Sequence, residues 1–239
     1  METHCEKCKG TGFLKEKEGK VSPCSCRFSE EDINRILGIP RRFWNAELDN
    51  YMCENPSESD AYKEVYIYAS SYEPSTGYGI TLIGPPGIGK THLVVGVLKK
   101  IYREKGIRGR FFDTKDLIYK LKALMEEGKS ARAIKTLLDL PLIVLDDLGS
   151  ERLSEWQREM ISYIISYRYN NLKSTLITTN FSLTGEEKKN KKLKKIVEDI
   201  DVPKALMADR LGAGTVSRIY EMTKVIYLQG RDRRKHNKI

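Results

Sequence analysis

The chain lacks any long hydrophobic run: no stretch of its 239 residues approaches the roughly 20 apolar residues that a membrane-spanning helix needs. Its opening residues, METHCEKCKG, also lack the apolar core of a secretory signal peptide. We find no internal repeat, which argues against a repeat architecture. These absences predict a cytoplasmic protein with no membrane partner.

Cysteine is nearly absent after residue 26, but four cysteines lie before that point. In a cytosolic chain such clustering favours a metal site over disulfides. The pairs Cys5-x-x-Cys8 and Cys24-x-Cys26 supply four thiolates, enough for a tetrahedral Zn²⁺ ion. A redox pair or an iron–sulfur cluster is the alternative, and His4 offers a substitute ligand. A segment of about 35 residues buries little surface, so the metal would supply its folding energy.

Acidic residues are outnumbered, because 42 lysine and arginine residues face 33 aspartate and glutamate residues, for a net charge of +9. A basic balance favours polyanionic partners, of which nucleic acid is the usual one. The alternative is a solvated lysine-rich surface. The same choice applies to the charge run GEEKKNKKLKKI at 185–196, which is either a solvated loop or a DNA contact.

Strand-like and helix-like segments alternate from Gly77 onward, which predicts an α/β fold with a parallel sheet covered by helices on both faces. Short apolar runs predict five strands, at 80–84, 110–113, 142–146, 174–179 and 224–228. We divide the chain into a Cys-rich zinc module (1–35), a linker and helical segment (36–75) and an α/β core (76–239).

Three helices have clear signals in the sequence. One is expected at 57–71, and a second runs through TKDLIYKLKALMEEG, with Thr114 as its cap and Gly128 at its end. The third begins after Ser154, which makes a capping-box pattern with Gln157. Four apolar residues share one face of this third helix and should lie in the core: Met160, Ile161, Ile164 and Ile165.

The stretch GPPGIGKT fits the phosphate-loop pattern G-x-x-x-x-G-K-[ST] in full. It follows a predicted strand and opens a predicted helix, as such a loop must; a chance glycine-rich turn is the alternative. Glycine lets backbone N–H groups turn toward phosphates, and the helix N-terminus adds its positive dipole end. Lys90 would reach the β- and γ-phosphates, and Thr91 would offer a hydroxyl to Mg²⁺. The loop consists of Gly84, Pro85, Pro86, Gly87, Ile88, Gly89, Lys90 and Thr91.

Two carboxylates end the apolar run LIVLDDLG at 142–149. Asp146 would hold Mg²⁺ together with Thr91, and Asp147 would orient or deprotonate the attacking water. A plain N-cap for the next helix is the alternative. Asn180 ends the following strand, ITTN, where its side chain could grip the water or the γ-phosphate; alone, it could equally be a turn residue.

Three arginines near the C-terminus offer positive charge to a phosphate. Arg210 suits an arginine finger that acts in a neighbouring protomer, and Arg218 competes for that role. Arg234 would sense the γ-phosphate within its own chain. Each is otherwise an ordinary surface ion-pair residue.

With these residues in place, the chain resembles the AAA+ ATPases of the DnaC/DnaI type, the bacterial loaders of the replicative helicase, which are related to IstB-like ATPases. The combination of the phosphate loop with LDDLG, RYNN and TTN is far more specific than the loop alone. The segments that carry the resemblance are GIPRRFWNAELDNY (38–51), GPPGIGKTH (84–92), LIVLDDLGSERLSEWQREMISYIISYRYNN (142–171), LITTN (176–180), DRLG (209–212) and GRDRR (230–234).

The resemblance implies an AAA+ P-loop core with a five-stranded parallel sheet. The family's finger pattern falls on Arg210 and its second sensor on Arg234, while Ile39 and Pro40 would lie near the adenine. His92, directly after the threonine of the loop, is habitual in the family and is expected in the nucleotide site.

The family also inserts a helix after the phosphate-loop helix, and DTKDLIYKLKALMEEGK would hold it. In related initiator ATPases this region contacts single-stranded DNA. Lys115, Lys120 and Lys122 are therefore candidate DNA contacts, with a solvated helix face as the alternative.

The function implied is ATP-dependent loading of the replicative DNA helicase hexamer onto single-stranded DNA. ATP or ADP, Mg²⁺ and Zn²⁺ would be bound, protomers would assemble with each other when ATP is present, and the Cys-rich module would dock on the helicase. Asp147 stands where many AAA+ proteins carry glutamate, which predicts slow turnover. Two alternatives stay open: an IstB-like transposition helper that binds duplex DNA and a transposase, and an ATP-binding adaptor with negligible turnover.

Overall fold

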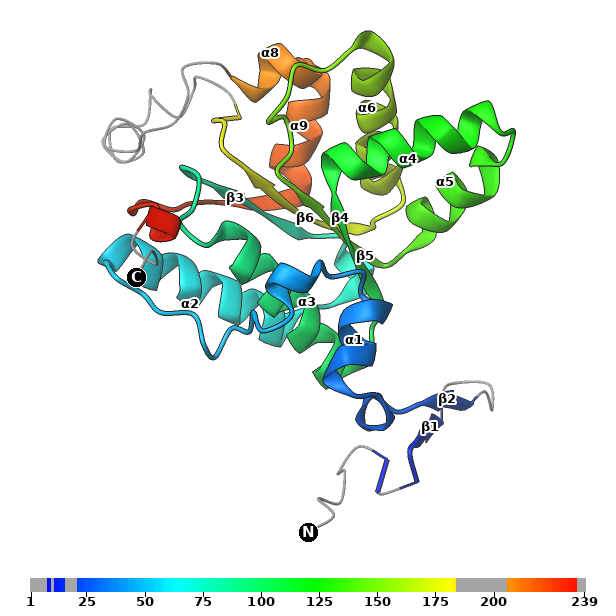
Figure 1. Cartoon of the computed structure of the whole chain (residues 1–239), viewed down its shortest axis with the longest axis vertical. Helices are drawn as coiled ribbons and strands as arrows, with labels where there is room; N and C mark the ends of the chain where they lie inside the picture. The colour runs from blue at the N-terminus through cyan, green and yellow to red at the C-terminus, as the bar shows by residue number, and fades with distance from the viewer. Residues whose placement is uncertain (1–7, 10, 16–20, 184–205, 236–239) are drawn as a thin grey trace.

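The computed structural model of the chain describes residues 8–9, 11–15, 21–183 and 206–235 (Figure 1). Three features of the sequence lie outside these residues: Cys5, His4 and the charge run at 185–196. Within the described part, no helix has both the length and the apolar character that crossing a bilayer demands.

A five-stranded sheet forms the centre of the molecule, and every neighbouring pair of its strands is parallel. The strand order is β4-β5-β6-β3-β7, so the strand before the phosphate loop lies inside the sheet. All five predicted strands are confirmed: β3 (Gly79–Ile83), β4 (Gly109–Asp113), β5 (Leu142–Asp146), β6 (Ser174–Thr179) and β7 (Thr223–Tyr227).

Helices cover both faces of the sheet, as the alternating pattern predicted (Figure 1). Side chains alternate across a strand, so β5 sends Leu142 and Val144 into one apolar core and Ile143 and Leu145 into another. The first core is closed by α1 (Glu30–Ile36), α2 (Pro56–Ser71) and α3 (Lys90–Lys105). The second is closed by α4 (Thr114–Glu126), α5 (Ser130–Asp139), α6 (Glu155–Asn170), α8 (Met207–Leu211) and α9 (Ala213–Met222).

The start of α6 follows the predicted capping box. The Ser154 hydroxyl accepts from Gln157 N–H, and the Gln157 side chain accepts from Ser154 N–H. Ile161, Ile164 and Ile165 are buried as predicted, and Met160 packs against the same core while staying half-buried.

The cap of α4 differs from the prediction by one residue. Asp113 caps the helix, because its carboxylate accepts the Asp116 N–H at 3.0 Å. Thr114 is the first helical residue instead, and its hydroxyl donates to the Asp146 carbonyl at 2.8 Å. This hydrogen bond to β5, which occupies the hydroxyl, has no local signal in the sequence. Gly128, with φ of +70°, follows the end of the helix as expected.

The Cys-rich N-terminal region carries a small antiparallel hairpin of β1 (Phe13–Lys15) and β2 (Val21–Pro23). A short helical turn, η2 (Ser25–Arg27), follows the hairpin and contacts α3. The hairpin projects beyond α1, away from the sheet (Figure 1). By contrast, α1 belongs to the main core, where Ile33 and Leu37 are buried. The apolar packing of the core therefore reaches back to Phe28, which packs against it.

A buried arginine joins α5 to the sheet. Arg168, in α6, is fully buried and donates to the carbonyls of Leu140 at 2.9 Å and Leu138 at 3.2 Å. It also donates to the Thr175 hydroxyl at 3.0 Å and to the Ser174 carbonyl at 2.5 Å, at the start of β6. The guanidinium thus satisfies carbonyls at the C-terminal end of α5, where a cation is favoured by the helix dipole.

Candidate nucleotide-binding site

A cavity of about 440 Å³ opens at the carboxyl ends of the strands, beside the first turn of α3. In open parallel sheets this edge is the usual place for a ligand. Ten of the lining residues were predicted from the sequence, and four others, Arg42, Phe43, Asp113 and Thr178, were not. The lining consists of Arg42, Phe43, Pro86, Gly87, Gly89, Lys90, Thr91, His92, Asp113, Asp146, Asp147, Thr178, Asn180 and Arg234.

The phosphate loop needs glycine at two positions. Gly87 and Gly89 have φ of +79° and +97°, a backbone conformation that side chains disfavour. A Cβ atom at Gly89 would lie 2.7 Å from the Tyr51 ring, and one at Gly87 would lie 1.7 Å from Asp232 Oδ1. The loop therefore passes between Tyr51 and Asp232, and α3 begins directly after it at Lys90. This arrangement fits the phosphate chain of a nucleotide.

Lys90 is buried beneath the loop. Its ammonium group donates to the carbonyls of Gly84 and Pro85 at 2.7 and 2.8 Å, and to Asn180 Oδ1 at 2.7 Å. Burial lowers the pKa of Lys90 to about 8, although the nearby Asp147 and Asp146 raise it. A polyphosphate would add negative charge at this point and stabilise the charged lysine.

Asp146 is buried at the end of β5 and is held by two threonines. Thr178 donates to its carboxylate at 2.6 Å, and Thr91 donates at 3.0 Å. Burial raises the pKa of Asp146 to about 6, while the hydrogen bonds from Thr178 and Thr91 lower it. A desolvated carboxylate next to a hydroxyl is a donor set that suits a hard cation such as Mg²⁺. The predicted magnesium ligands Thr91 and Asp146 thus lie together.

Asp147 differs from its neighbour in being exposed to solvent. Its φ of +54° is uncommon for a residue other than glycine, and aspartate is among those that tolerate it. Thr178 Oγ1 accepts the Asp147 N–H at 2.8 Å, and Asn180 Nδ2 donates to Asp147 Oδ1 at 3.1 Å. Since Asn180 also binds Lys90, a hydrogen-bonded chain runs from Lys90 through Asn180 to Asp147.

Asp113 adds a third carboxylate to the cavity and also caps α4. It ends β4 opposite Asp146, so the pairing of β4 with β5 brings the two acids to the same edge of the sheet. The Thr114 bond to the Asp146 carbonyl makes a second link. The start of α4 is therefore joined directly to the wall of the cavity.

The segment at 39–43 reaches the cavity through its later residues. Ile39 is buried in the core, and neither it nor Pro40 is among the lining residues, whereas Arg42 and Phe43 are. The chain turns at this point, because the short helix η3 (Arg41–Phe43) starts after Pro40 and carries Phe43 toward the loop. Gly84, Pro85 and Ile88 likewise belong to the loop without lining the cavity.

His92 lines the cavity and holds the segment at 47–51 against α3. Its Nε2 lies 2.7 Å from the Glu47 carbonyl and 2.9 Å from Asn50 Oδ1, and its ring meets the Tyr51 ring edge-on. Burial lowers the pKa of His92. The neutral imidazole donates its Nε2 proton to these oxygens, which explains a histidine at this position.

The three arginines lie in different places. Arg234 lines the cavity. Arg210 does not: it donates to the carbonyls of Gly149 and Glu151, both at 2.7 Å, and stacks over Phe181. Arg218 also lies outside the lining and donates to the Gly214 carbonyl at 2.9 Å. A finger role for Arg210 or Arg218 would have to be played in the cavity of another protomer.

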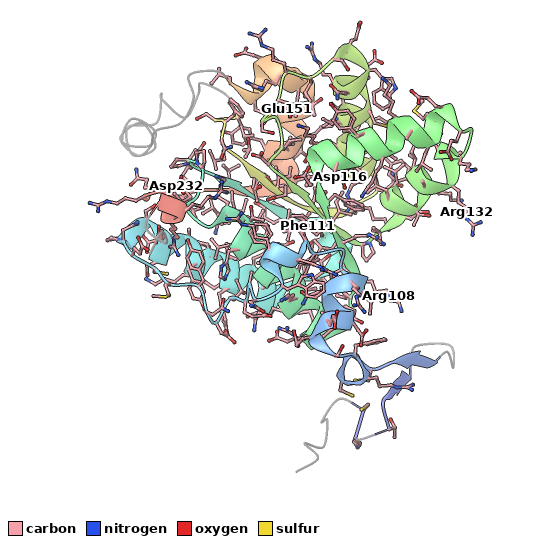
Figure 2. The ribbon with its side chains drawn as sticks, in the orientation of Figure 1. Arg108, Phe111, Asp116, Arg132, Glu151 and Asp232 are labelled. Carbon is pink, nitrogen blue, oxygen red and sulfur yellow. The ribbon has the colours of Figure 1, made fainter. Side chains whose placement is uncertain are left out.

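Two of the candidate DNA-contacting lysines on α4 are engaged in ion pairs. Lys115 binds Glu151, and Lys120 binds Asp116 at 2.6 Å; both acidic partners are labelled in Figure 2. Lys122 is exposed on the same helix. Exposed ion pairs of this kind are weak, so phosphate groups of DNA would compete for these lysines.

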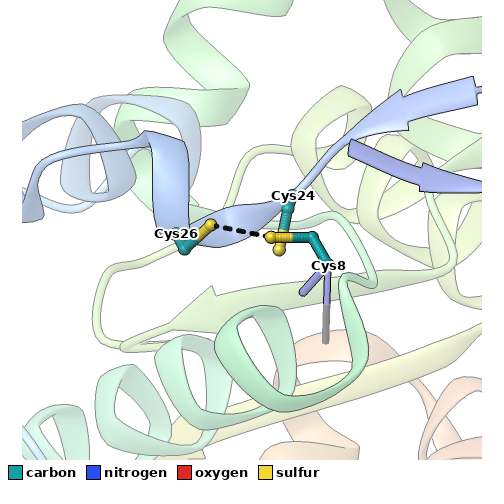
Figure 3. A group of neighbouring side chains, drawn as sticks. All are labelled: Cys8, Cys24 and Cys26. Carbon is teal, nitrogen blue, oxygen red and sulfur yellow. Dashed lines mark hydrogen bonds between the residues drawn. The ribbon is translucent and has the colours of Figure 1, made fainter. Parts of the chain in front are cut away.

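The sulfur atoms of Cys8, Cys24 and Cys26 all lie within 4.8 Å of one another (Figure 3). Cys8 and Cys26 Sγ are 3.5 Å apart, and Gly12 N–H donates to Cys8 Sγ at 3.2 Å. Three converging thiols, one of them supported by an N–H, suit Zn²⁺. The fourth predicted ligand, Cys5, lies outside the described residues, and Cys53 is exposed elsewhere.

Comparison with known proteins identifies relatives of this chain. Residues 57–213 match the family described as IstB-like ATP binding protein. The chain is 50% identical to the protein of a solved structure described as a crystal structure of the DnaC helicase loader. That match covers 80% of this chain and 100% of the other, with a TM-score of 0.68.

Two curated relatives come from Bacillus subtilis. The first, "Uncharacterized protein YqaM", is 25% identical over 180 residues, which cover 70% of this chain and 56% of the relative. The second, "Replicative helicase loader DnaI", is 23% identical over 155 residues, which cover 64% and 50%. The chain thus spans about half the length of these two proteins.

Proposed function

The chain belongs to the IstB-like ATP-binding proteins and, among them, to the DnaC-like helicase loaders, and from this premise we propose that it uses ATP as a switch to load a replicative DNA helicase onto single-stranded DNA. The observation that carries this proposal is the 50% identity to a DnaC helicase loader across the whole of that structure. Its place of action would be the cytoplasm, where the bacterial chromosome is replicated.

ATP binding would be the work of the phosphate loop and Lys90. The loop offers its N–H groups and the N-terminus of α3 to the phosphates. Lys90 would exchange its bonds to the Gly84 and Pro85 carbonyls for the phosphates, which explains why it is held at this position in advance. Mg²⁺, held by Thr91 and Asp146, would neutralise phosphate charge.

Hydrolysis to ADP and phosphate would depend on Asp147. Its exposed carboxylate accepts from Asn180, so the side chain is oriented while it stays accessible to water. We assign it the orientation or deprotonation of the attacking water, with Asn180 as the residue that links it to Lys90. The short aspartate side chain reaches less far than glutamate, which supports slow turnover of the kind that suits a switch.

Contacts between protomers would transmit the nucleotide state of the cavity to the neighbouring protomer. Arg210 holds the loop after Asp147 through Gly149 and Glu151, and Lys115 of α4 binds Glu151 as well. A change at Asp147 would therefore be passed on to both the proposed finger and the helix proposed to meet DNA. Residues 1–35 are the proposed helicase-docking module, in which Cys8, Cys24, Cys26 and Cys5 would hold Zn²⁺.

The test is to mix the purified chain with the replicative helicase hexamer of its own organism and to measure complex masses by native mass spectrometry. The arms are ATP, ADP, and ATP with Lys90→Ala; Cys24→Ser and the exposed Cys53→Ser form a matched pair. We expect a defined complex that nucleotide alters and that Cys24→Ser removes while Cys53→Ser does not. No complex in any arm, with zinc bound, would refute loading and favour the transposition helper, for which duplex DNA and a transposase are the partners to try.

A further inference from the structure

We propose that Arg233 is a positioning residue for the ATP site: it fixes the segment 229–234 against the phosphate loop and so holds Arg234 at the cavity. The inference rests on the ATP switch proposed above, but it needs neither helicase nor DNA. Arg233 itself does not line the cavity, and its neighbour Arg234 does.

The main chain of this segment is fitted to the phosphate loop. Arg233 N–H donates to the Gly87 carbonyl at 3.1 Å. Asp232, labelled in Figure 2, places Oδ1 where Gly87 has no side chain, only 1.7 Å from the position a Cβ would take. The same oxygen accepts the Arg234 N–H at 3.0 Å. The backbone of residues 232–234 is thus set by contacts with a single glycine of the loop.

The guanidinium of Arg233 points the other way, into the segment between residues 51 and 58. It donates to the Met52 carbonyl and to Glu58 Oε2, both at 2.7 Å, and its Cζ lies 4.7 Å from the centre of the Tyr51 ring. Glu58 is fully buried, so this ion pair is shielded from water. One side chain therefore joins two parts of the chain that are about 180 residues apart.

The same partner segment also touches the loop. The Tyr51 hydroxyl donates to the Ile88 carbonyl at 3.1 Å, and its ring packs against Gly89. A second tie lies nearby, where Asn55 donates to the Gln229 carbonyl at 3.0 Å and Gln229 N–H donates to Ser57 at 3.1 Å. The phosphate loop, Tyr51 and Arg233 thus each contact the other two, and Arg234 directly follows Arg233.

Positioning is needed because Arg234 is exposed and sits on a short terminal turn, η6 (Arg233–Lys235). A long side chain on a free segment samples many rotamers, and ordering it on a ligand costs binding free energy. Anchoring the preceding residue removes part of that cost. The expected result is discrimination between ATP and ADP, since the γ-phosphate is the part of the ligand that Arg234 is proposed to meet.

The experiment measures the dissociation constants of fluorescent mant-AMPPNP and mant-ADP, with Mg²⁺, on the full chain. Arg233→Ala alone would leave Glu58 buried without its ion-pair partner, so the informative variant is the neutral pair Glu58→Gln with Arg233→Gln. It is compared with Arg234→Ala, with the triple variant, and with Arg231→Ala, an exposed residue of the same segment, as the matched control.

We expect Arg234→Ala to weaken binding of mant-AMPPNP about tenfold more than binding of mant-ADP, because one charge-assisted contact is lost. The neutral pair should reproduce most of that selective loss, and the triple variant should lose no more than about twofold beyond Arg234→Ala, because coupled residues are not additive. Arg231→Ala should match the wild type.

Three results would overturn the inference: a neutral pair that binds like the wild type, a neutral pair that weakens both nucleotides equally, as general damage would, or losses that multiply in the triple variant. A wild-type chain that binds neither nucleotide would instead contradict the ATP switch itself. The two failures are therefore distinguishable.

Discussion

The nucleotide cavity and the Cys-rich region are built by opposite means. In the cavity, polar groups are paired within the protein: Asp146 accepts from Thr91 and Thr178, and Lys90 donates to Asn180. These residues stand on strands and helices with extensive apolar cores on both faces of the sheet. The Cys-rich region has two strands of three residues each and a cluster of thiols. The first region is shaped without its ligand, whereas for the second we propose that a metal supplies the cohesion.

This contrast predicts that a substitution in the cavity can abolish ATP hydrolysis while ATP binding is kept. Asp147→Asn should lower the rate of ATP hydrolysis on the order of 100-fold or more, the usual contribution of a general base. Asparagine tolerates the positive φ of this position and keeps the backbone bond to Thr178, so ATP affinity should stay within about twofold. Single-turnover hydrolysis and a binding titration measure the two effects. An unchanged rate would show that Asp147 is not the general base, and negligible hydrolysis by the wild type would favour the ATP-binding adaptor.

The next effect in size is on binding. Lys90→Ala should weaken ATP binding about 100-fold, because it removes a charge-assisted contact to the phosphates. The melting temperature of the protein should change little. Isothermal titration and thermal unfolding report the two quantities. Lys122→Ala, on the exposed face of α4, is the control and should bind ATP normally. A large loss of stability in Lys90→Ala would mean that the lysine stabilises the fold of the cavity in addition to binding phosphate.

A pH-dependent effect on stability tests whether burial of the Asp146 carboxylate destabilises the folded state. Its folded pKa of about 6 exceeds the ordinary 3.8, so the folded state holds the proton more tightly and stability falls as pH rises between these values. Asp146→Asn should therefore stabilise the nucleotide-free protein by about 1–3 kcal/mol at pH 7.5, and the gain should vanish near pH 4. Urea unfolding at both pH values measures it. A gain that is equal at pH 4 and pH 7.5 would contradict this account.

The smallest effect on the nucleotide cavity is expected from a change in the Cys-rich region. Cys24→Ser should abolish binding of one zinc per chain, as read by metal analysis, and remove helicase docking, yet leave ATP affinity within about twofold. Chelation of the wild-type metal should do the same. A parallel loss of ATP affinity would show that the two regions are coupled and that the contrast drawn here is wrong.

The parts of the fold that are local in sequence were predictable. The five strands are short apolar runs, and the capping box of Ser154 and Gln157 lies within four residues. The phosphate loop is equally local, because its strand, glycines and helix follow one another directly along the chain. Each of these features is decided by neighbours in the chain, which is the information that periodicity and motifs contain.

The residues that escaped prediction act across the fold. Asp113 and Thr178 reach the cavity only because β4 and β6 flank β5 in the sheet. Phe43 lines the cavity because η3 turns the chain there. Arg233 lies within GRDRR, and the motif predicts no role for it because its partners Met52 and Glu58 lie far away in sequence. Pairing of this kind has no local signature.

Arg168 shows the same limit for the core. It stands in the RYNN motif, where charge alone suggests a solvent-facing residue. In the fold it is fully buried among the carbonyls of α5 and β6, and burial lowers its pKa to about 9. Those carbonyls come from the end of α5 and the start of β6, which only the folded chain brings around Arg168. The motif can therefore be recognised in the sequence, but its role cannot be predicted from it.

The interlock of residues 51–58 with 229–234 has a consequence for the order of events during synthesis. The ribosome makes Tyr51 and the phosphate loop early, but their contacts through Gly87 and Glu58 are completed by Arg233, which is translated long after them. Contacts so distant in sequence form late and slowly. A nascent chain that already carries the entire phosphate loop therefore still lacks the contacts that fix this loop, until residues 229–234 have been translated.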